Sequence, residues 1–390
     1  MIHRLSGFFA LFFVLTFALH GQDEMIVIDK QARHANPTLR FDGVSGDANA
    51  AALVKNNIFL CGWFDVVRSG NADYVISGET LGNTVRLNVS NSAGKMITSV
   101  TGSDHRNAVD RMLHALFRIP GICQSKLVFT VMTSGGNKEL AMCNFDGTEI
   151  KQITRHRMIS MDPVWAPNGR SVVYSLIGKG FAHLIQYDIY TKLFRRVSRY
   201  DGINAGGALS PDGKYIALIL NLDNQVDLYV RELEGKTLHR LTRNKAVEAS
   251  PCWSPDGSMI CFVSDVSGRP VLYTVSPTGG TPKRLAGLAG SERVAPEWSR
   301  ENKLTYSARV GRNYVVAVAD MSSGTPVMEN MGEGVQAAAG EGPTWAPDGR
   351  HVAVEENGMV YIVDTWLGKK RALFRGKTKI GQPGWSPILK

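Results

Sequence analysis

The chain has 390 residues, with 44 Lys and Arg against 35 Asp and Glu, a formal net charge of +9, and five cysteines. The basic residues are spread along the chain, and no basic block carries the stacking aromatics or the reader motif of a nucleic-acid binder, so that class is excluded. An anionic polymer or an acidic partner remains open. The odd cysteine count without a C-x-x-C pair excludes a zinc ribbon and a disulfide framework.

The first 21 residues have the composition of a secretory signal peptide. Arg4 precedes an apolar stretch from Phe8 to Leu19, and the small Gly21 lies before Gln22. The apolar stretch is shorter than the ~20 residues that span a bilayer, although a retained membrane anchor is the alternative. We therefore expect residues 1–21 to be a signal peptide and the mature protein to be exported.

Residues 22–123 predict a small α/β domain. Apolar alternation predicts strands, and a stripe of apolar residues at helical spacing predicts a helix that ends before Pro120-Gly121. The predicted strands are Met25–Asp29, Tyr74–Ile76, Val85–Val89 and Met96–Val100, and the predicted helices are Asp47–Asn57 and Asn107–Phe117. No motif of this region carries catalytic chemistry.

A W-S-P-D-G motif and its variants recur through the rest of the chain. Successive copies are 40 to 47 residues apart, a period typical of propeller blades. Pro and Gly suit the second and fourth positions of a type I turn, so each copy predicts a turn between two strands. The copies are Trp165–Gly169, Leu209–Gly213, Trp253–Gly257, the eroded Trp298–Asn302, Trp345–Gly349 and the truncated Trp385–Pro387.

The array predicts a multidomain protein in which residues 124–390 form a six-bladed β-propeller. Residues 126–154 contain three strands without a preceding motif, and Pro383–Ser386 is a first strand without a following blade. Joining them completes a sixth blade from both parts of the chain and leaves no long unpaired edge. A β-sandwich with chance repeats is the alternative.

Two cysteines flank one of the predicted turns. Cys252 and Cys261 lie on neighbouring strands, where the cross-strand distance permits a disulfide. The corresponding positions of other repeats hold small apolar residues, so the alternative is a pair of buried thiols.

No enzyme motif is present. The segment Gly43–Asp47 lacks the closing glycine of a nucleophile elbow, and the chain has no H-E-x-x-H, phosphate-binding loop or dinucleotide fingerprint. His183, His239 and His351 lie on predicted strands or turns, where a surface or hydrogen-bonding role is favoured over metal ligation. We expect no cofactor and no metal. An enzyme or a polysaccharide-binding module with its site in the central channel stays open as the alternative.

The order of these parts resembles the TolB family, the periplasmic propeller proteins of the Tol–Pal system in Gram-negative bacteria. The resemblance spans the chain and is carried by Met25–Asp29, by the terminal Gly384–Pro387, and by the prolines of five P-x-W steps, Pro163, Pro251, Pro296, Pro343 and Pro383. It implies a periplasmic, non-enzymatic and monomeric protein. The implied partners are the peptidoglycan-associated lipoprotein, Pal, on one propeller face, and TolA at the mature N-terminus. The implied role is outer-membrane integrity and constriction at division.

The turns of the motif lie at one rim of the propeller, so the crossovers between blades lie at the other, where a docking partner would contact them. The candidate Pal-binding residues are Met161, Asp162, Ile203, Asn204, Ala205, Gly206, Glu248, Ala249, Ser250, Ala295, Gly381 and Gln382. The alternative is that they are ordinary loops. Ile203 and Gly206-Gly207 depart from the family pattern, in which this loop is more polar and contains proline.

The segment aligned with the family's TolA-binding residues is Gln22, Asp23, Glu24, Met25, Ile26, Val27, Ile28 and Asp29. A short terminus of this kind binds by adding a strand to a sheet edge. The alternative is that it forms only the first strand of the α/β domain.

Overall fold

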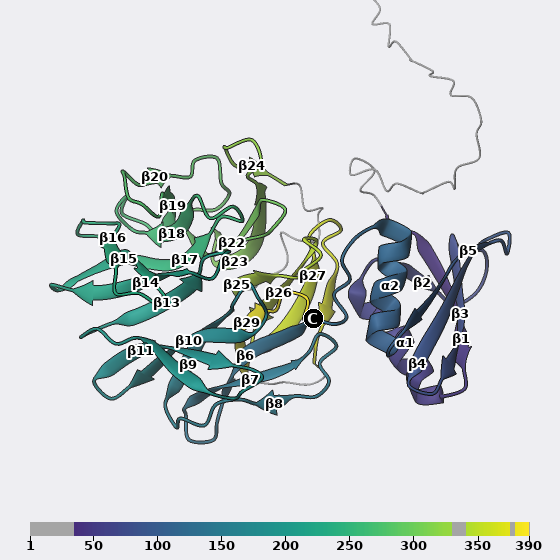
Figure 1. The fold of residues 1–390 in the computed structure, drawn as a ribbon. Coiled ribbons are helices and arrows are strands. Elements are labelled where there is room, and N and C mark those ends of the chain that lie inside the picture. Colours follow the sequence, from purple (N-terminus) through teal and green to yellow (C-terminus); the bar gives the residue numbers. More distant parts are fainter. Residues whose placement is uncertain (1–34, 330–340, 375–378, 390) are drawn as a thin grey trace, which may run out of the picture.

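The computed structural model describes residues 35–329, 341–374 and 379–389, and its first elements form a five-stranded sheet (Figure 1). In the order β2-β1-β3-β4-β5, β1 is parallel to β2 and β3, and the remaining pairs are antiparallel. The strands are β1 (Thr38–Ser45), β2 (Asp65–Val67), β3 (Tyr74–Leu81), β4 (Thr84–Asn91) and β5 (Met96–Gly102). The last three confirm predicted strands. The signal peptide and the predicted strand Met25–Asp29 lie outside the described residues.

Two helices, α1 (Ala48–Cys61) and α2 (His105–Phe117), confirm the predicted helices, and α1 is one turn longer than expected. Each begins at an aspartate, because Asp47 and Asp104 accept hydrogen bonds from backbone N–H groups of the first turn. α1 ends at Gly62, whose φ of 73° suits a residue without a side chain. In the described part of the chain, no helix is long and apolar enough to cross a membrane.

The remaining strands form sheets that fan out beside one another in one body, as in a β-propeller (Figure 1). Four of these sheets have four antiparallel strands each, joined in chain order. They are β13 (Asn204–Leu209), β14 (Tyr215–Leu222), β15 (Gln225–Glu232), β16 (Leu238–Arg240); β17 (Glu248–Trp253), β18 (Ile260–Ser264), β19 (Val271–Val275), β20 (Lys283–Arg284); β21 (Arg293–Trp298), β22 (Lys303–Val310), β23 (Asn313–Asp320), β24 (Val327–Met328); and β25 (Glu341–Trp345), β26 (His351–Glu356), β27 (Met359–Asp364), β28 (Lys370–Ala372).

The last sheet combines eight strands from distant parts of the sequence. One half is β9 (Ile159–Trp165), β10 (Ser171–Gly178), β11 (Phe181–Asp188) and β12 (Phe194–Ser198), and the other is β6 (Lys126–Met132), β7 (Lys138–Asn144), β8 (Lys151–Gln152) and β29 (Ile380–Trp385). The halves meet at a single parallel pair, Lys138 with Ile159. β29 pairs antiparallel with β6, which confirms that the Pro383–Ser386 strand joins the strands of residues 126–154.

The motif residues build the turns as their chemistry predicts. In the third copy, Gly257 N–H donates to the Ser254 carbonyl over 2.9 Å, and the Ser254 hydroxyl donates to Asp256 over 2.6 Å. Ser258 N–H donates to the same carboxylate. Asp256 therefore accepts from both sides of the turn, which lowers the pKa of its carboxyl.

Three of the motif tryptophans tie neighbouring sheets together. The indole Nε1–H of Trp253 donates to the Ala208 carbonyl of the preceding inner strand over 2.9 Å. Trp345 and Trp165 donate in the same way to the carbonyls of Glu297 and Gly384, both over 3.1 Å. These tryptophans are buried, so each indole N–H needs an acceptor, and the neighbouring backbone supplies it.

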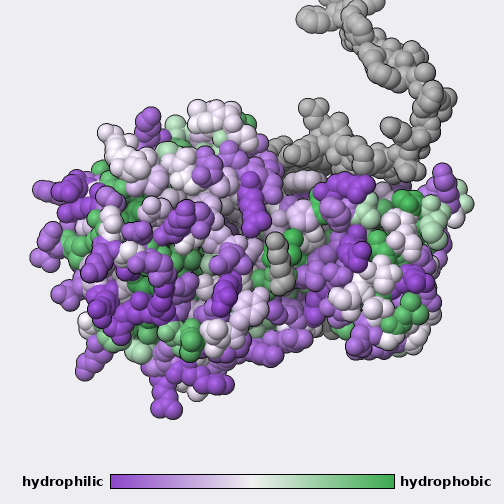
Figure 2. All heavy atoms as spheres, in the orientation of Figure 1, coloured by the Kyte–Doolittle hydropathy of each residue, from purple (hydrophilic) through white to green (hydrophobic). Residues whose placement is uncertain are grey.

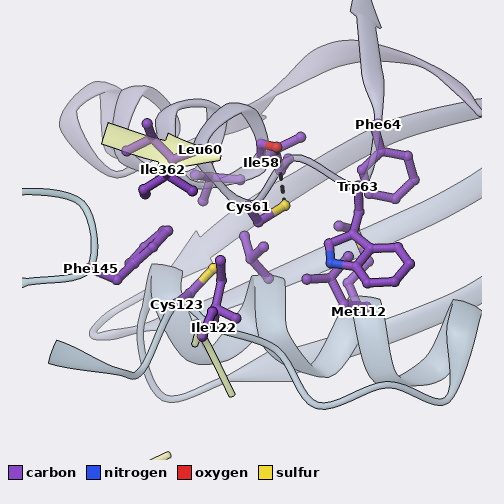
Figure 3. Close-up of a cluster of buried hydrophobic side chains, with 14 of the residues drawn as sticks. Ile58, Leu60, Cys61, Trp63, Phe64, Met112, Ile122, Cys123, Phe145 and Ile362 are labelled. Carbon is purple, nitrogen blue, oxygen red and sulfur yellow. Dashed lines mark hydrogen bonds between the residues drawn. The ribbon is translucent and has the colours of Figure 1, made fainter. Parts of the chain in front are cut away.

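One hydrophobic core continues from the N-terminal sheet into the propeller. Figure 3 shows Ile58, Leu60 and Cys61 of α1 gathered with Phe145 and Ile362, which come from the propeller. Burial of this apolar surface holds the two parts together. The face seen in Figure 2 is mainly hydrophilic, with hydrophobic side chains in small, scattered groups.

A buried guanidinium lies at the same junction. Arg350, in the turn before β26, is stacked between the rings of Trp63 and Trp366, 4.4 and 4.5 Å from their centroids. Its Nε donates to Asp364 over 3.0 Å, and its Nη2 donates to Asn36 over 2.7 Å. Arg350 therefore joins the start of the described chain to the sheet of β25–β28.

A histidine and a second carboxylate complete this cluster. His351 Nδ1 lies 2.7 Å from Asp348 Oδ2, and Trp63 Nε1–H donates to the same oxygen over 3.1 Å. Both partners of the His351–Asp348 contact are buried. The role of His351 is thus a hydrogen-bonding one, as the sequence favours.

The substitution Arg350→Met should lower the free energy of unfolding by about 3 kcal/mol, because it leaves the buried Asp364 carboxylate without its cation. Urea denaturation followed by tryptophan fluorescence measures the change. Arg195→Met is the matched control, since Arg195 pairs with Glu234 on the exposed surface and should change stability by less than about 0.5 kcal/mol. Equal effects of the two substitutions would contradict the structural role of Arg350.

Candidate functional site

Each innermost strand of the propeller sheets breaks its pairing register at one place. The break lies two or three residues before the motif Trp or its equivalent, and the residue there has a left-handed backbone conformation. We call these six residues the inner-strand bulges: Asp162 (φ 52°), Gly206 (φ 62°), Ser250 (φ 46°), Ala295 (φ 49°), Gly342 (φ 60°) and Gln382 (φ 48°). Five were named from the sequence. Gly342 was missed, although it precedes the Pro of a P-x-W step as four of its five counterparts do.

Four of the bulge residues are not glycine. Asp162, Ser250, Ala295 and Gln382 carry side chains in a region of φ that disfavours them, at a cost of order 1 kcal/mol each. Such strain persists only where the surrounding structure fixes the backbone, and it concentrates at binding and active sites. The bulges are therefore candidates for a functional surface.

Two bulge residues contact each other across neighbouring strands. Gln382 Nε2 donates to Asp162 Oδ1 over 2.6 Å, and the Asp162 backbone N–H donates to Gln382 Oε1 over 3.2 Å. Burial raises the pKa of the Asp162 carboxyl. Met161, Asp162, Gly381 and Gln382 are all half-buried, so the Asp162–Gln382 pair shapes the crossover rim more than it protrudes from it.

The crossover before β13 separates a structural residue from an exposed one. Asn204 is fully buried, where it accepts from the Ser198 hydroxyl over 2.5 Å and from the Tyr200 backbone N–H over 2.9 Å. It therefore closes the loop and cannot contact a partner directly. Ile203 is 41% exposed, and Ala205 and Gly206 are half-buried.

The crossover before β17 likewise contains one buried residue and one exposed residue. Glu248 is 1% exposed and accepts from Asn244 Nδ2 over 2.8 Å, whereas Ala249 is half-buried and Ser250 is exposed. Ala295, the corresponding bulge of β21, is half-buried. The crossover residues with exposed side chains are thus Ile203 and Ser250 among those named from the sequence. The other candidate segment, Gln22–Asp29, lies outside the described residues.

One inner-strand carboxylate was not identified from the sequence. Glu297 of β21 occupies the middle of a P-x-W step, and its Oε1 accepts from the Trp345 backbone N–H over 3.1 Å. Burial raises the pKa of this carboxyl to about 7. The only sign of this carboxylate in the sequence is its position. The middle residue of the step is Glu here, whereas the other repeats have small or apolar residues or, in one case, Thr344.

The cysteine pair is directly cross-strand. Cys252 and Cys261 face each other in the β17–β18 register, and both are free and buried in an apolar cluster. Burial raises the pKa of the Cys252 thiol far above its usual range, which makes it unreactive. The buried-thiol alternative agrees with this arrangement.

Two cavities lie at the propeller surface. The larger, of about 550 Å³, is at the turn rim between β9–β12 and β13–β16, and its walls carry the ion pairs Arg170–Asp188 and Arg195–Glu234. The smaller, of about 160 Å³, contains Glu248. Within the described ranges, no group of three His, Cys, Asp or Glu side chains is placed to hold a metal ion.

Comparison with known proteins finds a matching family model for the propeller part of the chain. A family model described as the TolB beta propeller domain matches residues 114–389. The crystal structure of TolB from Acinetobacter baumannii superimposes with a TM-score of 0.79 at 18% identity, over 91% of this chain and 97% of that one. Hydrazine synthase of Kuenenia stuttgartiensis superimposes with a TM-score of 0.52 at 14% identity, over 68% of this chain and 47% of that one, a likeness of fold alone.

The curated relatives match over shorter stretches. The chain is 33% identical over 81 residues to the Tol-Pal system protein TolB of Desulfosudis oleivorans, covering 20% of this chain and 18% of the relative. It is 31% identical over 115 residues to the same protein of Geobacter sulfurreducens, covering 27% of this chain and 26% of the relative. These alignments thus span about a quarter or less of the relatives' length.

The substitution Gly206→Ala should destabilise the protein more than Gly342→Ala. Both add a side chain at positive φ, which costs about 1 kcal/mol, but a Cβ at Gly206 would also lie 3.0 Å from Pro251 Cδ, whereas the space at Gly342 is open. Thermal unfolding of both variants, with wild type as reference, measures the difference. Equal costs would show that backbone conformation alone governs the bulge.

The Glu297 carboxyl should make stability depend on pH. Its pKa is about 7 in the folded protein and near 4.5 when unfolded, so its contribution is complete below about pH 4.5 and is lost as the pH rises through about 7. The free energy of unfolding of Glu297→Gln should therefore rise relative to that of wild type between pH 5 and pH 8, by up to about 3 kcal/mol. Urea denaturation at both pH values tests this, and a constant difference between the two proteins would refute it.

Proposed function

Because this chain belongs to the TolB β-propeller family, we propose that it is a non-enzymatic docking protein of the Tol–Pal system in the periplasm. It docks the peptidoglycan-associated lipoprotein on the crossover rim and TolA through residues 22–29, as a monomer, and so supports outer-membrane integrity and constriction at division. This association with the outer membrane is peripheral and runs through its partners.

The proposed architecture has three parts. Residues 1–21 are the signal peptide that exports the chain, residues 22–123 form the N-terminal domain, and residues 124–390 form six blades closed into a ring by β29. The four four-stranded sheets, together with the two halves of the eight-stranded sheet, support this count. The curated relatives are named as Tol-Pal system proteins, which supports the periplasmic location.

The observation that carries the docking surface is the set of inner-strand bulges. They recur at one rim, and four of the six hold non-glycine residues in a strained conformation. Ile203 and Ser250 are exposed at this rim and offer a partner direct contact. Asn204 acts on the surface indirectly, because it holds its loop from within.

Calorimetric titration with the soluble Pal domain of the same organism tests the docking surface. Ile203→Asp should weaken binding at least about tenfold, because it places a charge in the desolvated centre of an interface. Leu193→Asp is the matched control, since Leu193 is an equally apolar residue, 69% exposed on the turn rim, and it should bind like wild type. Failure of folded wild type to bind Pal would overturn the proposed function.

Removal of residues 22–29 should abolish capture of TolA, because the strand that the segment would add is lost. The same truncated protein should still bind Pal. Pull-down with purified TolA domain measures this, and undiminished capture would assign the TolA contact to another part of the chain.

A further inference from the structure

Beside the crossover rim, the sheet of β17–β20 encloses a small pocket of about 160 Å³. Glu248 lines it from the start of β17, and Phe262 and Tyr273 line it from β18 and β19. Val266, in the turn after β18, is half exposed and forms part of its mouth. The pocket therefore has an acidic group, two aromatic walls and an apolar entrance.

The carboxylate in this pocket is incompletely satisfied. Glu248 is 1% exposed, its Oε1 accepts from Asn244 Nδ2 over 2.8 Å, and its Oε2 has no hydrogen-bond partner among the described residues. A buried carboxylate oxygen without a donor costs free energy. Burial raises the pKa of this carboxyl, whereas the Asn244 hydrogen bond and the Ser264 hydroxyl, which faces Glu248 in the β17–β18 register, lower it in part.

Other buried carboxylates of the propeller have partners that Glu248 lacks. Asp227 is paired with Arg240 and accepts from the Thr242 hydroxyl, and Asp364 is paired with Arg350. Glu139 accepts from Thr154 and from the Arg157 backbone. No Lys, Arg or His of the described chain forms an ion pair with Glu248, so the position suits a cation from outside.

The aromatic walls and the small volume of the pocket indicate which kind of cation fits it. Phe262 and Tyr273 lie with ring centroids 6.1 Å apart, and aromatic rings attract an ammonium group that passes over them. The volume is below the roughly 300 Å³ of a drug-sized ligand site, so it suits one side chain. A guanidinium pairs best with both oxygens of a carboxylate, whereas Asn244 already occupies Oε1. A single free oxygen favours the point charge of an ammonium.

We propose that this pocket takes the ε-ammonium and alkyl stem of a lysine from the partner protein that docks on the crossover rim. The proposal rests on the proposed function for the source of the lysine, and on the pocket alone for the ligand chemistry. Glu248 lies two residues before the exposed bulge residue Ser250, so a partner seated on that bulge reaches the pocket mouth. Glu248 then acts as the counter-ion and Val266 packs against the alkyl stem.

The pocket chemistry is tested on the protein alone by NMR titration with n-butylammonium, n-butanol and n-butylguanidinium. Butylammonium should shift the resonances of Phe262 and Tyr273 and bind more tightly than the other two. Glu248→Gln keeps the shape of the side chain and should weaken binding at least about tenfold. Glu234→Gln, on the turn rim, is the matched control and should bind like wild type. Equal binding of butanol, or no effect of Glu248→Gln, would overturn the proposal.

The source of the lysine is tested by titrating the soluble Pal domain into the same variants. Glu248→Gln should weaken Pal binding by about tenfold and Glu234→Gln should not, with melting temperatures confirming that both are folded. Unchanged Pal affinity of Glu248→Gln would remove the partner lysine from the pocket. If wild type binds butylammonium but not Pal, the proposed function fails and the pocket stands. If it binds Pal but not butylammonium, the pocket proposal fails and the function stands.

Discussion

The hydrogen bond from a motif tryptophan to the neighbouring inner strand is the constraint on which the propeller depends. Trp165, Trp253 and Trp345 are buried, so each indole needs an acceptor, and a carbonyl just after a bulge provides it. The other two motif tryptophans, Trp298 and Trp385, donate to side chains instead. The acceptor strand must approach closely. A Cβ on Gly384 would lie 2.5 Å from the Pro163 carbonyl, so glycine is required at that junction. The sheets are thus fixed to one another by backbone geometry as well as by apolar packing.

The same geometry links packing to the proposed docking surface. A bulge interrupts the ladder of the inner strand, which turns the following carbonyl toward the next sheet and leaves a strained residue at the crossover rim. Buried polar residues then hold the crossovers in place, as Asn204 does from within its loop. Among the candidate residues named from the sequence, Ile203 and Ser250 are the exposed ones.

Repetition made most of the propeller predictable from the sequence. The turn motif located the strand pairs, and the truncated copy at Trp385 predicted the pairing of β29 with β6. The parallel contact between Lys138 and Ile159 was not predictable, because it depends on how two sheet halves meet in space. β1 was missed because its regular alternation is short and ends at the register shift between Phe41 and Gly43, and β2 was missed because it has only three residues.

The candidate site was predictable in position but not in exposure. Spacing from the motif copies located the crossovers and so named five of the six residues that form the bulges. The burial of Asn204 and Glu248 follows from tertiary contacts that a pattern does not contain. The arrangement around Arg350 was equally hidden, since Asn36 and Trp63 are far from it in the sequence.

The pairing of β29 with β6 has a consequence for biosynthesis. Trp385 pairs with Leu127, so the hydrogen bonds between β29 and β6 cannot form until almost the whole described chain has left the ribosome. Until then, β6 presents an unpaired edge, and closing so long a loop carries a large entropic cost. The last strand pairing of this sheet is therefore made only at the end of synthesis, and the propeller part of a nascent chain stays incompletely folded until then.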